Sequence, residues 1–254
     1  MKLTSGLEAF WEAASKNYPE QVRPGGPLDM EIAMEKVLNP DCSDRFSKPS
    51  VRGWMSSIYP KTFDKRSTKI GALALTYKGL IQLKTPFDLA LYTRLIWELQ
   101  PKTILELGSL QGGSGLWFAD QMSLLCEDPG HVHSFDLHTK CIHERAKHPL
   151  LTFHNIDLSD LAAFDGEMLT NAPHPWLVID DAHVQIFSVF DYLNRRFLLS
   201  GDYYVIEDNP MKADKEMMDG LQLVERAGFL VDTYYTDAFG INVTCAPNAW
   251  LRKS

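Results

Sequence analysis

The stretch Thr103-Ile-Leu-Glu-Leu-Gly-Ser-Leu-Gln-Gly-Gly-Ser114 runs from a short apolar strand directly into a glycine-rich turn. Gly108 allows a tight turn after the strand, and Gly112 and Gly113 allow a ligand and the following helix to come close to the backbone. The spacing differs from the G-x-G-x-x-G of nicotinamide-binding domains, because Leu110 stands where a second glycine would be expected. The turn therefore favours a ligand that lacks a pyrophosphate.

Short apolar runs alternate with segments of helical length along the chain around this turn. The runs have the β-branched or aromatic character of buried parallel strands, and the segments between them are amphipathic. This alternation predicts an α/β fold with a doubly wound, Rossmann-like, mostly parallel seven-stranded sheet. We expect strands at 103–107, 132–135, 151–154, 177–180 and 203–207, and helices near 86–99, 114–125, 139–147, 160–169, 184–199 and 214–227.

The last part of the chain breaks this rhythm. Residues 229–235 and 242–245 are strand-like runs joined across Asp237-Ala-Phe-Gly240, with no helix between them. Two such runs separated by a short connection with glycine favour antiparallel pairing. We therefore expect a C-terminal antiparallel hairpin at the edge of the sheet.

The first part of the chain has a different composition. Residues 5–17 and 28–38 have the pattern of short amphipathic helices, and residues 40–69 read as an irregular segment with isolated aromatic side chains. That irregular segment could be a lid over a site or a surface wrap that only adds stability. We divide the chain into an N-terminal helical and irregular cap and lid at 1–76 and a main α/β domain at 77–254.

Composition and charge limit the possible partners. The chain has 254 residues and a formal net charge of −8, which argues against nucleic-acid and anionic-membrane surfaces because both attract basic patches. The four cysteines form no C-x-x-C pair, and the first fifteen residues contain no long apolar stretch. We expect a soluble, cytoplasmic protein that acts on a small-molecule substrate.

Acidic side chains and a glycine stand at the ends of successive predicted strands. Glu106 could accept from the amino group of S-adenosylmethionine or orient the turn, and Asp136 is placed to hold a ribose diol. Asp157 could accept from an adenine amine. Taken singly, each acid could equally be a helix cap or a solvated loop residue, but their order favours S-adenosylmethionine. The residues expected to bind this cofactor are Glu106, Gly108, Gly112, Ser114, Asp136, Asp157 and Asp180.

A second set of acids follows two neighbouring strands. Asp180 ends one apolar run, and Glu207 and Asp208 end another. Hard oxygen donors at one sheet edge suit Mg²⁺ or a similar cation such as Mn²⁺. His183 has the side chain whose unperturbed pKa is closest to neutrality, so it can act as a general base. The alternative is that these acids only cap the helix expected from Val184 and solvate a loop.

Several short motifs occur together between residues 77 and 252. They are Tyr77-x-Gly79, Leu83-Lys84-x-Pro86-x-Asp88-Leu89, Glu106-x-Gly108, Asp180-Asp181-Ala-His183, Val205-Ile-Glu-Asp208 and Thr244-x-Ala-Pro-Asn-x-Trp250. In these motifs the chain resembles the cephalosporin hydroxylase and rhamnosyl O-methyltransferase family, which is similar to macrolide sugar O-methyltransferases. The resemblance implies a class I, metal-dependent methyltransferase domain and a homo-oligomer.

The resemblance also implies roles for individual residues. Asp180, Glu207 and Asp208 would be the metal ligands, and His183 would be the general base. This chain has Asp181 in place of the usual small residue after the first aspartate, so either adjacent acid could face the ion. We expect that it is Asp180.

The residues and the resemblance together predict an enzyme. We expect an S-adenosylmethionine-dependent, divalent-metal-dependent O-methyltransferase that acts on a hydroxyl of a small natural product, such as a sugar, polyol or phenol. The metal motif favours a hydroxyl acceptor because a bound cation lowers the pKa of an oxygen nucleophile. The alternatives are a carboxyl- or N-methyltransferase on the same fold and a non-catalytic cofactor-binding partner subunit.

Overall fold

The computed structural model describes residue 16 and residues 45–52, 76–164, 166–208 and 215–254. The chain divides into two compact units, Met1–Phe46 and Ser47–Ser254. The helices expected at 5–17 and 28–38 lie outside the described residues, except for Lys16, and so does most of the irregular segment. The domain boundary between residues 76 and 77 therefore stays a prediction.

A mixed sheet runs through the second unit. Its strand order in the described residues is β1-β9-β10-β8-β7-β4-β5-β6, and β4, β5, β6, β7 and β8 are parallel. The predicted α/β fold with a mostly parallel sheet is confirmed, but the sheet has eight strands within the described residues and not the expected seven. A separate two-stranded ribbon pairs β2 with β3. The strands are β1 (Phe46–Ser47), β2 (Thr76–Tyr77), β3 (Leu80–Ile81), β4 (Thr103–Leu107), β5 (His131–Asp136), β6 (Leu151–Asn155), β7 (Trp176–Asp180), β8 (Tyr203–Ile206), β9 (Phe229–Asp232) and β10 (Trp250–Lys253).

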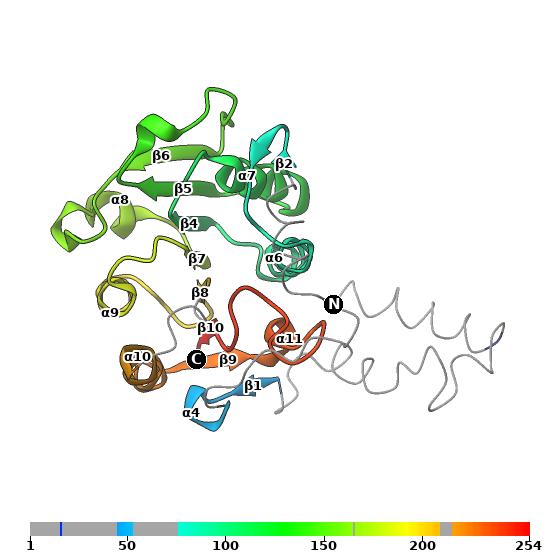
Figure 1. Cartoon of the computed structure of the whole chain (residues 1–254), viewed down its shortest axis with the longest axis vertical. Helices are drawn as coiled ribbons and strands as arrows, with labels where there is room; N and C mark the ends of the chain where they lie inside the picture. The colour runs from blue at the N-terminus through cyan, green and yellow to red at the C-terminus, as the bar shows by residue number, and fades with distance from the viewer. Residues whose placement is uncertain (1–15, 17–44, 53–75, 165, 209–214) are drawn as a thin grey trace. The chain divides into compact units, whose positions relative to one another are not determined.

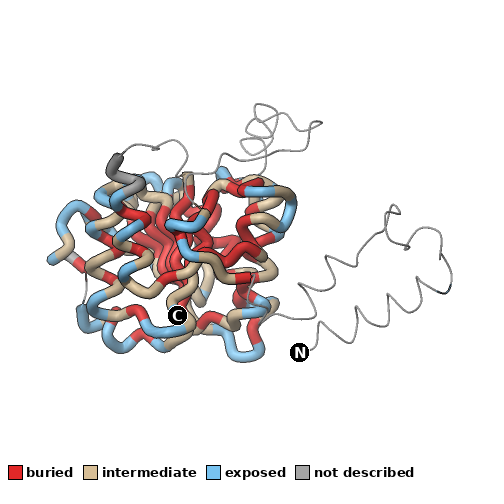
Figure 2. The backbone as a smooth tube through the Cα atoms, turned by 90° about the horizontal axis from the view of Figure 1, so that it is seen from below, coloured by how far each residue is buried: buried red, intermediate tan, exposed pale blue. Residues whose placement is uncertain are grey.

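Helices cover both faces of this sheet (Figure 1). One face carries α6 and α7, and the other carries α8, α9 and α10. All residues of β4 and β7 are buried as a result, and Figure 2 shows the buried residues concentrated along the sheet. The helices are α4 (Pro49–Arg52), α6 (Pro86–Leu99), α7 (Gly113–Leu125), α8 (Gly166–Asn171), α9 (Ile186–Arg196), α10 (Lys215–Arg226) and α11 (Thr233–Thr236).

The helix expected at 86–99 has the predicted bounds. Thr85 accepts a hydrogen bond from the backbone N–H of Asp88, and Pro86 occupies the first helical position. The helix ends at Gln100, which has a left-handed backbone and donates to the carbonyl of Ile96. None of the described helices has the length and apolarity needed to cross a membrane.

Two expected helices differ from the prediction. Residues 139–147 form only a short 3₁₀ turn, Thr139–Cys141. The backbone N–H of His143 instead donates to the carbonyl of Gln111 in the glycine-rich turn, so this segment braces the turn. Residues 160–169 split into a 3₁₀ turn, Leu161–Ala163, and the start of α8.

The C-terminal hairpin is antiparallel as predicted, but its second strand and its position were wrong. β9 ends at Asp232, whose carboxylate accepts from the N–H of Tyr234 and starts α11. Residues 242–245 are not a strand, and Asn242 at their start adopts a left-handed conformation with a φ of 56°. The second strand is β10, which pairs with both β8 and β9 and so lies inside the sheet.

Candidate functional site

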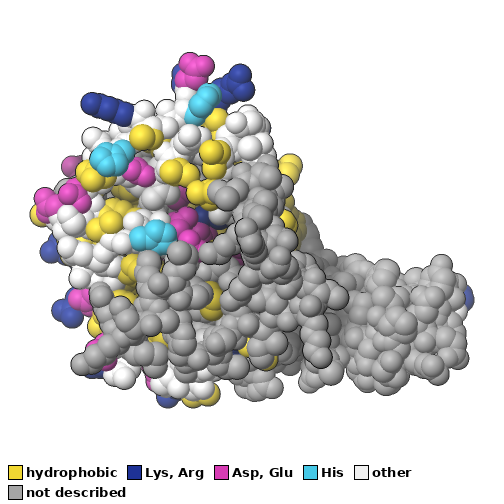
Figure 3. Space-filling model, viewed as in Figure 1, with side chains coloured by type: hydrophobic (Ala, Val, Ile, Leu, Met, Phe, Trp, Pro, Cys, Tyr) yellow, Lys and Arg dark blue, Asp and Glu magenta, His cyan; other side chains and the backbone are white. Residues whose placement is uncertain are grey.

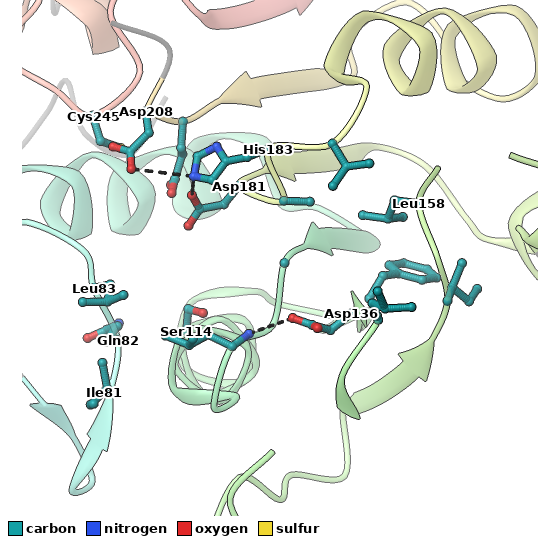
Figure 4. A pocket seen from close by; sticks show the side chains of 18 of the residues that line it. Ile81, Gln82, Leu83, Ser114, Asp136, Leu158, Asp181, His183, Asp208 and Cys245 are labelled. Atoms are coloured by element: carbon teal, nitrogen blue, oxygen red, sulfur yellow. Dashed lines mark hydrogen bonds and ion pairs between the residues drawn. The ribbon is translucent and has the colours of Figure 1, made fainter. Parts of the chain in front are cut away.

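A cavity of about 360 Å³ lies at the carboxyl ends of the parallel strands. This is the edge at which open α/β sheets bind ligands. The residues that follow β4, β5, β6, β7 and β8 all contribute to its lining. Figure 4 shows the glycine-turn side of this cavity, with Ser114 and Asp136, facing a group made of Asp181, His183 and Asp208.

The glycines of the turn are required by close packing within the chain. Gly108 has a φ of 104°, and a Cβ atom there would lie 3.0 Å from the carbonyl of Asp181. Gly112 has a φ of 83°, and a Cβ atom there would lie 2.8 Å from the side chains of Ala146 and Phe153. Gly108 lines the cavity and Gly112 does not, so only Gly108 is placed to face a ligand.

Asp136 holds the turn in shape. Its Oδ2 accepts from the backbone N–H groups of Ser109 and Leu110 at 3.0 and 3.1 Å, and its Oδ1 accepts from His138 N at 2.8 Å. The carboxylate also lines the cavity (Figure 4). Its expected contact with a ribose stays a prediction, and clamping of the turn is a further role that the sequence did not show.

Glu106 lies behind the turn and does not line the cavity. It is fully buried, its Oε2 accepts from the hydroxyl of Ser134, and that hydroxyl is 2.6 Å from the Ser109 hydroxyl. Its Oε1 has no hydrogen-bond partner in the structure. Burial raises the pKa of Glu106 from 4.5 to about 7. Of its two expected roles, this position supports orienting the turn.

Substituting Glu106 with glutamine is expected to change how stability depends on pH. Because the native pKa is raised, the stabilisation from the protonated carboxyl is full below pH 4.5 and is lost as the pH rises through about 7. Relative to wild type, Glu106→Gln should therefore gain stability between pH 5 and pH 8.5, by up to about 3 kcal/mol. Urea unfolding at pH 5 and at pH 8.5 measures the free energy of unfolding of the variant and of wild type. The exposed Glu144→Gln serves as the control, and an equal shift in both variants would contradict the assignment.

Ser114 and Asp157 also line the cavity, from the start of α7 and from the loop after β6. Asp157 is exposed, and its Oδ1 accepts from the N–H and the hydroxyl of Ser159 at 2.9 and 2.6 Å. These hydrogen bonds lower the pKa of Asp157. Its carboxylate is therefore a charged acceptor at one end of the cavity, and its contact with an adenine stays a prediction.

Asp181, His183 and Asp208 form a group of potential metal ligands within the described residues. One donor atom from each side chain lies within 4.8 Å of the other two. His183 Nε2 is 3.5 Å from Asp181 Oδ1 and 3.8 Å from Asp208 Oδ2 (Figure 4). His183 and Asp208 have left-handed backbones with φ of 60° and 51°, a strained conformation for residues other than glycine that is frequent at functional sites.

The preference for Asp180 as the acid that faces an ion stays a prediction, but the positions of the two side chains favour Asp181. Successive residues at a strand end point to opposite faces of the sheet, so only one of the two can face the cavity. Asp180 is 2 % exposed, does not line the cavity and accepts a hydrogen bond of 2.9 Å from the Tyr204 hydroxyl. Asp181 lines the cavity beside His183. Asp180 is therefore not among the described residues that line the cavity or that form the acid–histidine group.

Glu207 lines the cavity, but both of its oxygens have partners in the chain. Oε1 accepts from the Tyr92 hydroxyl at 2.5 Å, and Oε2 forms a close ion pair with Lys84 Nζ. Lys84 Nζ is also 3.0 Å from Asp181 Oδ2. The sequence contains Lys84 within a family motif, but a single lysine before a helix gave no reason to place it among the acids.

The chain is similar to proteins of a known family. The family model described as "Rhamnosyl O-methyltransferase/CmcI" matches residues 72–254. The chain belongs to this family. The resemblance stated from the sequence motifs is therefore confirmed, and the match begins close to β2 at Thr76.

Curated members of the rhamnosyl O-methyltransferase/CmcI family are similar to part of the chain. A rhamnosyl O-methyltransferase of Mycobacterium leprae (strain TN) is 29% identical over 141 residues, which are 53% of this chain and 60% of that protein. One of Mycobacterium tuberculosis (strain ATCC 25618 / H37Rv) is 29% identical over 139 residues, which are 53% and 56%. The match thus spans less than two thirds of these relatives' length.

Solved structures of CmcI are similar over more of the chain. The structure described as "cmcI-D160 Mg-SAM" is 26% identical, with a TM-score of 0.61, and the match covers 86% of this chain and 95% of that one. The structure described as "CmcI-N160 apo-structure" is 26% identical, with a TM-score of 0.63, and the match covers 79% and 89%. Both support the α/β fold described above.

Proposed function

We propose that this chain is an S-adenosylmethionine-dependent, divalent-metal-dependent O-methyltransferase that acts on a hydroxyl of a small molecule. The observation that carries the proposal is a single cavity with the glycine turn on one side and Asp181, His183 and Asp208 on the other. A methyl donor on the turn and a hydroxyl acceptor at the acid–histidine group would meet there. The family and a neighbour described with Mg and SAM support the same function.

The cofactor side of the site has groups suited to a nucleoside with a charged amino-acid portion. Gly108 and Ser114 offer close backbone approach and a hydroxyl, and Asp136 and Asp157 offer carboxylate acceptors. Glu106 would act from behind, through Ser134 and the turn. These groups can bind a ligand that has no pyrophosphate, which is the kind of ligand that the glycine spacing of the turn favours.

The acid–histidine group fits a small divalent cation. Asp181 and Asp208 supply carboxylate oxygens, which Mg²⁺ and Mn²⁺ prefer, and His183 supplies an imidazole nitrogen at the same place. We propose Asp181 and Asp208 as ligands, with Glu207 beside them. A cation held there would lower the pKa of an acceptor hydroxyl and fix its oxygen.

His183 is the side chain best placed to take a proton from the acceptor. It lines the cavity, its side chain is 41% exposed, and two carboxylates lie within 4 Å of Nε2. Those carboxylates would stabilise the imidazolium that forms when Nε2 takes the proton. We propose that Asp181 and Asp208 orient His183 for this step.

The rim of the cavity suggests an acceptor with an apolar portion. Leu83, Leu110 and Leu137 line it and are 44%, 48% and 52% exposed. On the face of the molecule drawn in Figure 3, acidic and histidine side chains lie next to one another among hydrophobic side chains. We propose a glycoside or phenol that presents a hydroxyl to the cation and an apolar group to Leu83, because Leu110 and Leu137 lie on the cofactor side with Asp136.

A methyl-transfer assay tests the proposed function. Radiolabelled S-adenosylmethionine and Mg²⁺ are incubated with the chain and a panel of rhamnosides, polyols and phenols, with carboxylate and amine acceptors for comparison. We expect label to enter at least one hydroxyl acceptor and the transfer to stop when a chelator is added. Chelator-resistant transfer, or transfer only to an amine or a carboxylate, would contradict the proposal.

Replacing Asp136 with alanine should weaken binding of S-adenosylhomocysteine. The change removes the acceptor for three backbone N–H groups and the only carboxylate proposed to hold the ribose. We expect at least about a tenfold loss in affinity, the usual effect of losing a hydrogen bond to a charged group. Calorimetry measures the affinity, and Mn²⁺ binding in the same variant should be unchanged. Wild-type cofactor affinity would move the ribose site elsewhere.

A further inference from the structure

Lys84 is a buried lysine beside the proposed metal site. It stands between β3 and α6, its side chain is 2% exposed, and it does not line the cavity. Its Nζ lies 3.0 Å from Asp181 Oδ2 and pairs closely with Glu207 Oε2. Lysine is almost never fully buried unless it is paired, so these two carboxylates account for its position.

Several carboxylate oxygens of Asp181 and Glu207 already have partners within the chain. Lys84 occupies Oδ2 of Asp181, which leaves Oδ1 toward His183. Both oxygens of Glu207 are occupied, by Lys84 and by the Tyr92 hydroxyl. Lys84 therefore holds Asp181, one of the two proposed ligands, and Glu207, which lies beside them.

We propose that Lys84 is a built-in cation that holds Asp181 and Glu207 together before metal loading and competes with the divalent ion for Asp181. The inference rests on the proposed function, since it requires a divalent ion to bind beside Asp181. Three carboxylates close to one another repel, and one ammonium group between two of them reduces that repulsion. The same ammonium lowers the affinity of the site for a dication, because like charges repel.

Lys84 is a positioning residue and cannot act as a base here. Burial lowers its pKa, but the charges of Asp181 and Glu207 outweigh burial and raise the pKa well above its ordinary value. An ammonium group paired with two carboxylates at hydrogen-bond distance has no lone pair to accept a proton. Because it does not line the cavity, it acts on the acceptor only through Asp181 and Glu207.

The decisive variant is Lys84→Met, which removes the charge and keeps an unbranched apolar side chain. We expect Mn²⁺ to bind about tenfold more tightly or better, because the competing charge at hydrogen-bond distance is gone. We also expect the chelator-treated variant to melt at a lower temperature than wild type, because Asp181 and Glu207 lose their counter-ion. Mn²⁺ should then raise the melting temperature more than it does in wild type.

A matched control is Lys78→Met. Lys78 is exposed and pairs with Asp120 at 2.7 Å on another part of the surface. It should change neither the Mn²⁺ affinity nor the melting temperature after chelation by a comparable amount. The double variant Lys84→Met/Glu207→Gln removes both charges of the buried pair and keeps the test decisive if the single variant does not fold. We expect it to bind Mn²⁺ more tightly than Glu207→Gln alone.

The outcomes separate this inference from the proposed function. Wild-type protein that binds Mn²⁺ while Lys84→Met binds it equally or more weakly overturns the role of Lys84 and leaves the metal site standing. A double variant no tighter than Glu207→Gln overturns it in the same way. Wild-type protein that does not bind Mn²⁺ at all overturns the metal site itself.

Discussion

Asp181→Asn is expected to abolish metal-dependent methyl transfer, whereas Asp180→Asn is expected to leave metal binding intact. Asp181 lines the cavity and faces His183, and asparagine there removes one of the two proposed carboxylate ligands. We expect its affinity for Mn²⁺ to fall by more than about 100-fold, beyond the losses seen when only supporting residues of a metal site are changed. Calorimetry with Mn²⁺ and the methyl-transfer assay measure both effects.

Asp180→Asn is the matched control at the neighbouring position. The two substitutions are chemically identical, but Asp180 is buried against Tyr204 and Asp181 lines the cavity and pairs with Lys84. Asp180 accepts from the buried Tyr204 hydroxyl, so its replacement should lower stability by about 1–3 kcal/mol through a weakened hydrogen bond to a charged group. If Asp180→Asn lost Mn²⁺ and Asp181→Asn kept it, the adjacent acids would have to exchange roles.

His183→Ala should lower the rate of methyl transfer by about two to four orders of magnitude at neutral pH, the usual contribution of a general base. His183 lines the cavity with its side chain 41% exposed, so its loss should not unfold the chain. Single-turnover rates at saturating acceptor measure the effect. The variant should keep its cofactor affinity.

Metal affinity in the same variant separates two roles of the imidazole. If His183 only takes the proton, Mn²⁺ binds to His183→Ala nearly as well as to wild type. If Mn²⁺ affinity falls together with the rate, His183 is instead a third ligand beside Asp181 and Asp208, as their spacing also permits. An unchanged rate would remove His183 from the mechanism.

Features set by local sequence were predictable. α6 has the predicted bounds because Thr85 and Pro86 mark its start, and these signals depend only on neighbouring residues. The parallel strands were predictable for a similar reason, since strands buried on both faces read as continuous apolar runs. The acids at the strand ends followed from that placement.

Features set by register or by distant contacts were not predictable. Asp180 and Asp181 differ by one residue, and which of them faces the cavity depends on where the strand stops within the sheet. Lys84 is 123 residues from Glu207 in the sequence. No pattern of neighbouring residues in the sequence could therefore indicate this ion pair. The tail was misread because Asn242 turns the chain where the apolar pattern suggested the start of a strand.

Calorimetric titration of the wild-type chain with S-adenosylhomocysteine, in Mg²⁺ and then in chelator, tests whether the cavity binds the cofactor beside the proposed metal site. We expect saturable binding of one ligand per chain in both conditions, because the cofactor groups lie on the opposite side of the cavity from Asp181 and Asp208. We also expect methyl transfer to require the metal. If S-adenosylhomocysteine did not bind at millimolar concentration, with or without Mg²⁺, the proposed methyltransferase function would be contradicted.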